Sequence, residues 1–328
     1  MNYELVNFCE FDENAVKSYC AIHNEDEKKN LGDITKVNIS SLPKCDLITH
    51  GSPCQDFSIA GDNKGGDEES GTRSSLLWNS VKIIEHCKPK FVIWENVKNV
   101  LSNKHKHNFD KYIDTLNSFG YTSIYHLTNA IDYDLPQNRE RIFVVSIRND
   151  IYKKFSFPIN GEHPCLSMEK FIDKGIKRHI NKTLERFFDE KYKHDYSVSK
   201  NGLHKMFDGE KDGGFASDFT NKRIYSIYGC SPTLTTCGNV NLWEEKGMMT
   251  EKEMFRLMGF TDEDFYKASS TGIAKMYLHR QAGNSICVKV PYYIFKELIK
   301  EYPKDTKDMK VISLFSGIGA FEKALELL

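Results

Sequence analysis

The chain has 328 residues, of which 40% are hydrophobic, 28% charged and 12% aromatic. Such a composition is typical of a folded globular protein and argues against a disordered one. The formal net charge of −1 does not indicate a polyanionic partner, so any basic binding surface must be local. Nine cysteines without a Cys-x-x-Cys pair fit neither a disulfide framework nor a zinc site. This cysteine spacing predicts a protein without a bound metal. Because no apolar run is long enough to cross a membrane, we expect a cytoplasmic protein.

The first 150 residues alternate between strand-like and helix-like segments. Apolar runs predict strands within 3–10, 45–54, 90–97 and 141–148, and amphipathic spacing predicts helices within 12–24, 75–89 and 109–121. This alternation predicts an α/β fold with a parallel sheet and right-handed crossovers. Functional side chains gather beyond the carboxyl ends of the strands in such sheets. Three predicted strands end at chemically capable residues, namely Glu10, Pro53-Cys54 and Glu95.

The rest of the chain divides into a polar region and a second helical region. Residues 151–225 carry 15 lysines and arginines against 11 acidic residues, which indicates a smaller, mildly basic domain at 151–248. A long insertion without a binding role is the alternative. Helical spacing returns from 249, so the predicted main domain comprises 1–150 and 249–328. After a charged linker at 303–310, a predicted strand at 311–315 runs into Gly317-Ile318-Gly319 and a further helix.

A thiol, a carboxylate and two guanidiniums stand out as candidate catalytic groups. Cys54 follows Pro53 in a stiff loop after a strand, which suits a nucleophile, although a buried structural cysteine is the alternative. Glu95 ends an apolar strand and could hold or donate a proton, or could be a charge at a helix N-terminus. Arg139 and Arg141 lie on one side of an extended segment and could bind carbonyl oxygens or phosphates. Either arginine alone could instead belong to a structural ion pair.

Several blocks of the sequence together resemble those of DNA (cytosine-5) methyltransferases. They are Pro-Cys-Gln within 51–61, Glu-Asn-Val at 95–97, "QNRERIFVV" at 137–145, "GNS" at 283–285 and "FSGIGAFE" at 315–322. The resemblance implies a Rossmann-like, doubly wound methyltransferase sheet, with 151–248 as a target-recognition domain. The block that usually leads the family comes last here, which indicates a circularly permuted member. We therefore expect the strand at 311–315 to insert beside the strands that contain 3–8 and 46–49.

The resemblance also implies S-adenosyl-L-methionine as the cofactor. Gly317 and Gly319 would let the backbone approach it closely, and Glu10 would accept hydrogen bonds from its ribose hydroxyls. The other implied contacts are an adenine ring facing Phe315, an adenine amino group on Asp33 with Ile34 packing the ring, and a pocket wall formed by Leu77, Asn284 and Ser285. "SPTLTT" at 231–236 resembles the segment at the end of the family's recognition domain.

The chemistry of cytosine assigns a role to each candidate catalytic group. Addition of the Cys54 thiolate to carbon 6 would activate carbon 5 for methylation. Glu95 would hold or protonate ring nitrogen 3, Arg141 would bind the exocyclic oxygen, and Arg139 would stabilise the cysteine loop. Because a paired base cannot reach such a pocket, the cytosine must be flipped out of double-stranded DNA. The remaining implied DNA contacts are Gln55, Ser58 and Thr233. We expect a prokaryotic or phage-encoded enzyme that acts as a monomer on DNA.

Three other interpretations have distinguishable signatures. An RNA cytosine-5 methyltransferase would share the thiol and the glutamate but lack a large recognition insert. A DNA-binding homologue without activity would have lost Cys54 or Glu95, and both are present. A nicotinamide oxidoreductase is compatible with the glycine turn and with nothing else in the chain.

Overall fold

The computed structural model describes residues 2–53, 73–162, 167–213 and 222–328, which form two compact units. The first unit comprises Met1–Thr128, Glu140–Pro158 and Pro291–Leu328, and the second comprises Asn129–Arg139 and Ile159–Val290. Residues 249–290 therefore group with the second unit, whereas the sequence suggested that they belong with the main domain. The functional division into a catalytic and a target-recognition domain stays a prediction.

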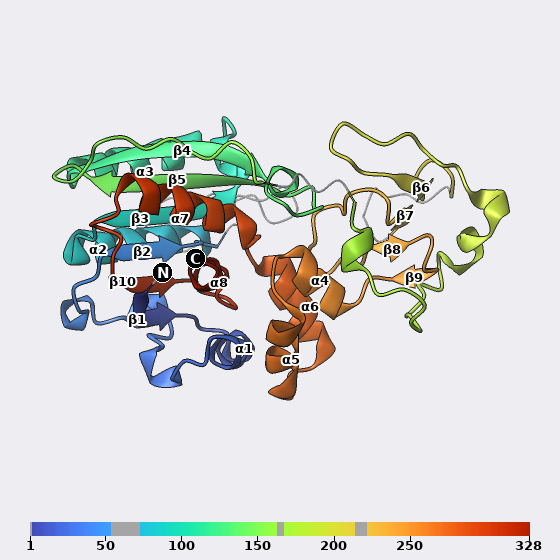
Figure 1. Ribbon diagram of the computed structural model, residues 1–328, viewed down its shortest axis with the longest axis horizontal. Helices are drawn as coiled ribbons and strands as arrows, with labels where there is room; N and C mark the ends of the chain where they lie inside the picture. Colours follow the sequence, from blue (N-terminus) through green and yellow to red (C-terminus); the bar gives the residue numbers. More distant parts are fainter. Residues whose placement is uncertain (1, 54–72, 163–166, 214–221) are drawn as a thin grey trace. The chain divides into compact units, whose positions relative to one another are not determined.

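The first unit is built on a six-stranded sheet in the order β1-β10-β2-β3-β5-β4 (Figure 1). The strands are β1 (Tyr3–Cys9), β2 (Leu47–His50), β3 (Phe91–Val97), β4 (Tyr121–Asn129), β5 (Glu140–Arg148) and β10 (Met309–Leu314). β10 pairs in parallel with β1 on one side, Leu314 opposite Cys9, and with β2 on the other, Leu314 opposite His50. The predicted insertion of the last strand between the strands containing 3–8 and 46–49 is confirmed.

Helices cover both faces of this sheet, which confirms the predicted doubly wound α/β fold. They are α1 (Glu13–His23), α2 (Leu77–Cys87), α3 (Lys106–Ser118), α7 (Lys289–Glu301) and α8 (Ala320–Glu326). Val92 and Trp94 of β3 pack in one apolar cluster with side chains of α2 and α3. Phe91, which points to the opposite face because strand side chains alternate, makes an edge contact with Tyr302 just beyond α7, at a centroid distance of 5.5 Å.

β5 departs from the predicted all-parallel sheet. It runs antiparallel to β3, with Glu95 opposite Phe143 and Val97 opposite Arg141. The reason is β4, which the sequence analysis did not predict. This strand lies between α3 and β5 in the chain and is joined to β5 by residues 130–139. This connection is shorter than the crossover that a parallel arrangement of β4 and β5 would require.

The second unit combines three helices with a small sheet. The helices are α4 (Glu251–Leu257), α5 (Asp262–Ser270) and α6 (Lys275–Asn284), and the sheet has the order β6-β7-β8-β9. Its strands are β6 (Lys205–Asp208), β7 (Arg223–Tyr225), β8 (Asn241–Leu242) and β9 (Gly247–Met248). α4 and α5 each begin in a complete capping box, formed by Thr250 with Glu253 and by Thr261 with Asp264.

Short 3-10 helices connect the larger elements. They are η1 (Glu27–Lys29), η2 (Ile34–Lys36), η3 (Ile39–Ser41), η4 (Arg73–Leu76), η5 (Lys98–Leu101), η6 (Ala130–Asp132), η7 (Glu169–Phe171), η8 (Glu185–Phe188) and η9 (Glu190–Tyr192). Across the residues that the structure describes, no helix has the length and apolar character needed to cross a bilayer.

Candidate active site

The turn between β10 and α8 has an unusual backbone. Phe315, Gly317 and Gly319 all have positive φ angles, of 55°, 56° and 81°. Glycine adopts this conformation freely, but an aromatic residue there is strained, and such strain is concentrated at ligand-binding sites. The pattern of glycines predicted from the sequence is therefore required by the conformation of the turn.

Hydrogen bonds join this turn to the carboxyl end of β1. The amide of Ser316 donates to the carbonyl of Cys9 over 3.1 Å, and the amide of Gly317 donates to Oε2 of Glu10 over 2.9 Å. The other Glu10 carboxyl oxygen accepts from the amide of Asp12. Burial raises the pKa of Glu10, although the Asp12 and Gly317 amides counteract this shift. Residues from opposite ends of the chain thus place the predicted carboxylate directly on the glycine turn.

Asn30 is a residue at this site that the sequence analysis missed. Its side chain accepts from the amide of Glu10 over 3.1 Å and donates to the carbonyl of Glu10 over 3.0 Å. It also accepts from the amide of Gly32, so one amide side chain aligns β1 with the loop before η2. The asparagine two residues before a glycine is a turn signal that could have identified it.

Asp33, Ile34 and Leu77 lie in two different environments. Asp33 caps η2 through bonds from the amide and hydroxyl of Thr35, which lower its pKa. Ile34 is 7% exposed and Leu77 0%, and both belong to the apolar cluster that includes Cys9. The predicted contact of Asp33 with the adenine amino group, the packing of Ile34 on the ring and the place of Leu77 in the pocket wall stay predictions.

Glu95 and Arg141 form an ion pair at the carboxyl end of β3. Arg141 Nε lies 3.1 Å from Glu95 Oε1, and the two side chains are 17% and 11% exposed. Because Val97 is opposite Arg141 in the register, Glu95 and Arg141 are diagonal neighbours on one face of the sheet. This contact is an ion pair of the kind that the sequence analysis gave as the alternative for either arginine, and the predicted catalytic roles of Glu95 and Arg141 stay predictions.

The residues on either side of Glu95 hold the segment that leads to Cys54. Trp94 Nε1 donates to Ser52 Oγ over 3.0 Å, and Asn96 Nδ2 donates to the carbonyl and hydroxyl oxygens of Ser52 over 3.1 and 3.2 Å. All three side chains are buried. Cys54, Gln55 and Ser58 lie outside the described residues, so their assignments stay predictions.

His50, at the end of β2, is fully buried beneath this segment. Its ring stacks on Trp94 at 6.1 Å, and Nε2 lies 3.0 Å from the Tyr112 hydroxyl. Burial lowers the pKa of His50 to about 3, so the ring is neutral at physiological pH. A neutral imidazole and the Tyr112 hydroxyl can share this hydrogen bond, with the donor set by the tautomer of the ring.

In the second unit, one guanidinium connects three of the family-like blocks. Arg139 donates to the carbonyls of Leu234, Gly283 and Ser285 over 2.8–3.0 Å and is 4% exposed. Gly283 packs so closely on this segment that a Cβ atom would lie 2.5 Å from the carbonyl carbon of Thr235. The structure thus accounts for the glycine of "GNS" and for the arginine before β5. A role of Arg139 toward the cysteine loop stays a prediction.

The other predicted residues of the second unit differ in exposure. Asn284 is exposed at the end of α6, whereas Ser285 is buried. The Thr233 hydroxyl donates to the carbonyl of Asn138 over 2.5 Å. Binding of a phosphate by this hydroxyl would require it to exchange that partner, and the contact stays a prediction.

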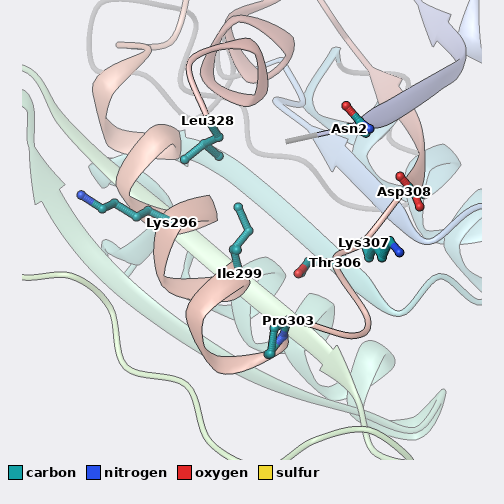
Figure 2. A pocket seen from close by; sticks show the side chains of 8 residues that line it. All are labelled: Asn2, Lys296, Ile299, Pro303, Thr306, Lys307, Asp308 and Leu328. Atoms are coloured by element: carbon teal, nitrogen blue, oxygen red, sulfur yellow. The ribbon is translucent and has the colours of Figure 1, made fainter.

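The first unit contains a hollow of about 410 Å³, whose lining residues are shown in Figure 2. It is lined by Lys296 and Ile299 of α7, by residues before β1 and β10, and by Leu328. Because parallel strands begin at this edge, the hollow lies at the amino edge of the sheet. The Glu10 and Glu95 clusters lie at the carboxyl edge, so the hollow is not part of the candidate active site.

Comparisons with known proteins agree on one family. The family described as "C-5 cytosine-specific DNA methylase" matches residues 1–300. Type II methyltransferase M2.ScrFI of Lactococcus lactis subsp. cremoris is 38% identical over 272 residues, covering 83% of this chain and 71% of the relative. Type II methyltransferase M.HhaI of Haemophilus parahaemolyticus is 30% identical, covering 81% of this chain and 80% of the relative.

Solved structures show the same fold. The S. pombe Dnmt2 methyltransferase superposes with a TM-score of 0.63 at 18% identity, covering 90% of this chain and 91% of that chain. A putative prophage-encoded DNA modification methyltransferase (E. coli) has the same TM-score and identity and covers 91% and 93%. The match over most of the chain, together with the identity to curated relatives, shows that this chain belongs to the C-5 cytosine-specific DNA methylase family.

Proposed function

We propose that this chain transfers a methyl group from S-adenosyl-L-methionine to carbon 5 of a flipped-out cytosine in double-stranded DNA, with Cys54 as nucleophile. Methylation of cytosine in DNA is the activity of its family. The observation that best supports the proposal is the pairing of Glu95 with Arg141 beside the Trp94–Ser52–Asn96 contacts. These contacts hold Ser52, two residues before Cys54 in the sequence, at the strand end that also carries a carboxylate and a guanidinium.

The residues around the glycine turn fit an adenosine-containing cofactor. A Cβ added at Gly317 would meet no atom within 4 Å, so this backbone is open to a ligand. The carboxyl oxygens of Glu10 each accept one backbone amide and retain lone pairs for ribose hydroxyls. Oδ2 of Asp33 lies 3.6 Å from Lys36 Nζ and has lone pairs that can accept from an adenine amino group. We assign Phe315, Gly319, Ile34, Leu77, Asn284 and Ser285 to the same cofactor as proposals.

The proposed reaction needs both a nucleophile and charge stabilisation. S-adenosyl-L-methionine supplies an electrophilic methyl group when it is bound. The Cys54 thiolate would form a bond to carbon 6, which shifts electron density to carbon 5. The new carbon–carbon bond would form there as the bond between the methyl group and the cofactor sulfur breaks, leaving that sulfur as a neutral thioether. Protonated Glu95 donates to ring nitrogen 3, and Arg141 stabilises the exocyclic oxygen while keeping Glu95 in place. Loss of the carbon-5 proton then breaks the Cys54 bond and restores the aromatic ring.

We further propose that residues 151–248 contact the duplex and that the enzyme acts on it as a monomer. Gln55, Ser58 and Thr233 are the proposed contacts beside the flipped base. We also propose that the chain is circularly permuted within its family. Two observations support the permutation: β10 pairs between β1 and β2, and the family match ends at residue 300, before the block at 315–322.

Trapping the covalent adduct tests the nucleophile directly. A duplex with 5-fluorocytosine at the methylated position, identified first by bisulfite sequencing of DNA from an expressing host, should become attached to the wild-type protein. Mass spectrometry should place the adduct on Cys54, and Cys54→Ser should give no adduct while it still binds the duplex. Cys237→Ser, which removes an exposed thiol, is the matched control and should form the adduct normally. An active protein that never becomes attached would contradict the proposed mechanism.

A further inference from the structure

His23, the last residue of α1, lies against the glycine turn. Its side chain is 2% exposed, Nε2 lies 3.0 Å from the carbonyl oxygen of Ile318, and Nδ1 lies 2.5 Å from Oε1 of Glu326. The ring is so close to Gly319 that a Cβ atom at that position would overlap Nε2. His23 therefore contacts both the glycine turn and the last turn of α8.

The identity of these partners determines where the protons are. A carbonyl oxygen only accepts hydrogen bonds, so Nε2 must carry a hydrogen. A proton must also lie between Nδ1 and Glu326, because a lone pair there would face a carboxylate. Because the pKa of Glu326 is lowered and that of His23 is raised, we infer that this proton belongs to the ring, which pairs as an imidazolium with the Glu326 carboxylate. The other Glu326 oxygen lies 3.3 Å from Lys323 Nζ.

The surroundings favour this charge state. Burial by itself lowers the pKa of His23, but the Glu326 hydrogen bond, the charges of Glu322 and Glu326 and the Ile318 carbonyl raise it above its ordinary value of 6.5. The pKa of Glu326 is lowered, since its bond to His23 outweighs burial. No other α1 or α8 pair among the described residues brings a histidine and a carboxylate into such contact.

Glu322 is the second acidic group facing His23. It is 1% exposed, and neither carboxyl oxygen has a hydrogen bond of normal geometry to a described residue. Burial raises its pKa, while the His23 charge and the nearby hydroxyls of Ser313 and Tyr19 lower it. The ring of Tyr19 lies 4.8 Å from the ring of His23. Among the described residues, the titratable or charged groups near His23 are Glu322, Glu326 and Lys323 of α8 and Tyr19 of α1. Tyr3 of β1 and Glu25 interact electrostatically with Tyr19, and Tyr3 also interacts with Glu322 and Glu326.

We propose that His23 is a positioning residue for the cofactor: its doubly protonated ring joins the Ile318 carbonyl to the Glu326 carboxylate and holds residues 315–319 in their binding conformation. The proposal rests on the proposed binding of S-adenosyl-L-methionine at this turn. Deprotonation of the ring leaves the Nε2 hydrogen on the Ile318 carbonyl but turns the Nδ1 lone pair toward the Glu326 carboxylate, which breaks the link between the turn and α8. The strained backbone at Phe315 then loses a restraint that maintains it.

The sign of the pH dependence follows from the raised pKa. The contribution of His23 to folding stability is complete below about pH 6.5, the pKa in the unfolded chain, and is lost as the pH rises through the higher pKa of the folded protein. Over that range the folded protein also loses the charged ring that holds the turn in its binding conformation. Cofactor affinity should therefore decline on the alkaline side. The cofactor's own amino group also titrates, near pH 8 in free amino acids, so the informative quantity is the difference between wild type and variant.

The experiment is isothermal titration of S-adenosyl-L-methionine into wild type, His23→Gln and Glu326→Gln between about pH 6 and pH 9.5. At pH 6, His23→Gln should bind at least tenfold more weakly, the range for loss of a charged hydrogen bond. The difference from wild type should shrink at high pH. At saturating cofactor, kcat and duplex affinity should stay near wild type, which distinguishes positioning from a general structural defect. Glu326→Gln should move the alkaline decline to lower pH. His86→Gln, which changes an exposed histidine in the last turn of α2, is the matched control.

Each outcome has one interpretation. A wild-type protein that does not bind the cofactor refutes the proposed function, whatever the variants do. Wild-type binding with unchanged affinity in His23→Gln refutes the positioning role alone. If His23→Gln does not fold by circular dichroism, Glu326→Gln decides, because an alkaline decline identical to wild type overturns the proposal. Nitrogen NMR of labelled histidine should show both ring nitrogens of His23 protonated at pH 6, and a neutral ring would also overturn it.

Discussion

Burial of His50 should make the protein lose stability in mild acid. Its pKa is about 3 in the folded protein, because burial disfavours the charged ring, whereas an unfolded histidine has a pKa of about 6.5. Between these values the unfolded chain binds one more proton, so each pH unit of acidification costs about 1.4 kcal/mol of unfolding free energy. At about pH 5.0, which is 1.5 units below the unfolded pKa, the loss is about 2 kcal/mol. This contribution is complete above pH 6.5 and is lost as the pH falls toward 3.

Urea unfolding of wild type and His50→Gln at several pH values measures this loss. Glutamine removes the titrating ring but keeps an amide that can bind the Tyr112 hydroxyl, and Trp94, stacked on His50, provides a fluorescence signal. From about pH 7.5 to pH 5.0, wild type should lose about 2 kcal/mol more than His50→Gln, because all other groups are common to both proteins. His86→Gln should follow wild type. Parallel curves for wild type and His50→Gln would show that His50 is protonated in the folded protein and would refute the reasoning.

Two further substitutions test packing and the cysteine segment. Gly283→Ala should lower the unfolding free energy by about 1–3 kcal/mol, because the added methyl group meets the backbone of residues 235–236, whereas exposed Met276→Ala on the same helix should change it by less than about 0.5 kcal/mol. Ser52→Ala removes the acceptor of the buried Trp94 indole and one bond of Asn96, so kcat should fall at least tenfold while cofactor affinity stays unchanged. If a methylation assay gave the same kcat for wild type and Ser52→Ala, Ser52 would have no role in aligning Cys54.

Much of the first unit was predictable because its information is local. Apolar runs of strand length followed by amphipathic helices predicted β1, β2, β3, β5 and their helices. The position of β10 also followed from sequence, since the family blocks indicate which strand the glycine turn follows. Edge strand β4 was not predicted. Five of its nine residues are half-buried and two are exposed, so it lacks the continuous apolar run that marks a central strand.

The partners of the side chains that hold the site together were not predicted from the sequence. Asn30 on Glu10, Arg139 on three carbonyls and His23 under the glycine turn all join segments that are distant in sequence. A polar side chain that binds backbone carbonyls leaves no pattern in composition or periodicity, because every residue has a backbone carbonyl whatever its side chain.

The sequence alone determined which residues carry the chemistry and where they stand along the chain. It placed Glu10 and Glu95 at strand ends, glycines in the turn, and the strand before that turn last in the chain. Tertiary structure decided which of these groups meet. It pairs Glu95 with Arg141 through antiparallel register, and it brings residue 317 to residue 10 through a parallel strand from the other end of the chain. The physical reason is that strand order and register depend on how whole faces pack, and a single segment does not specify its neighbours.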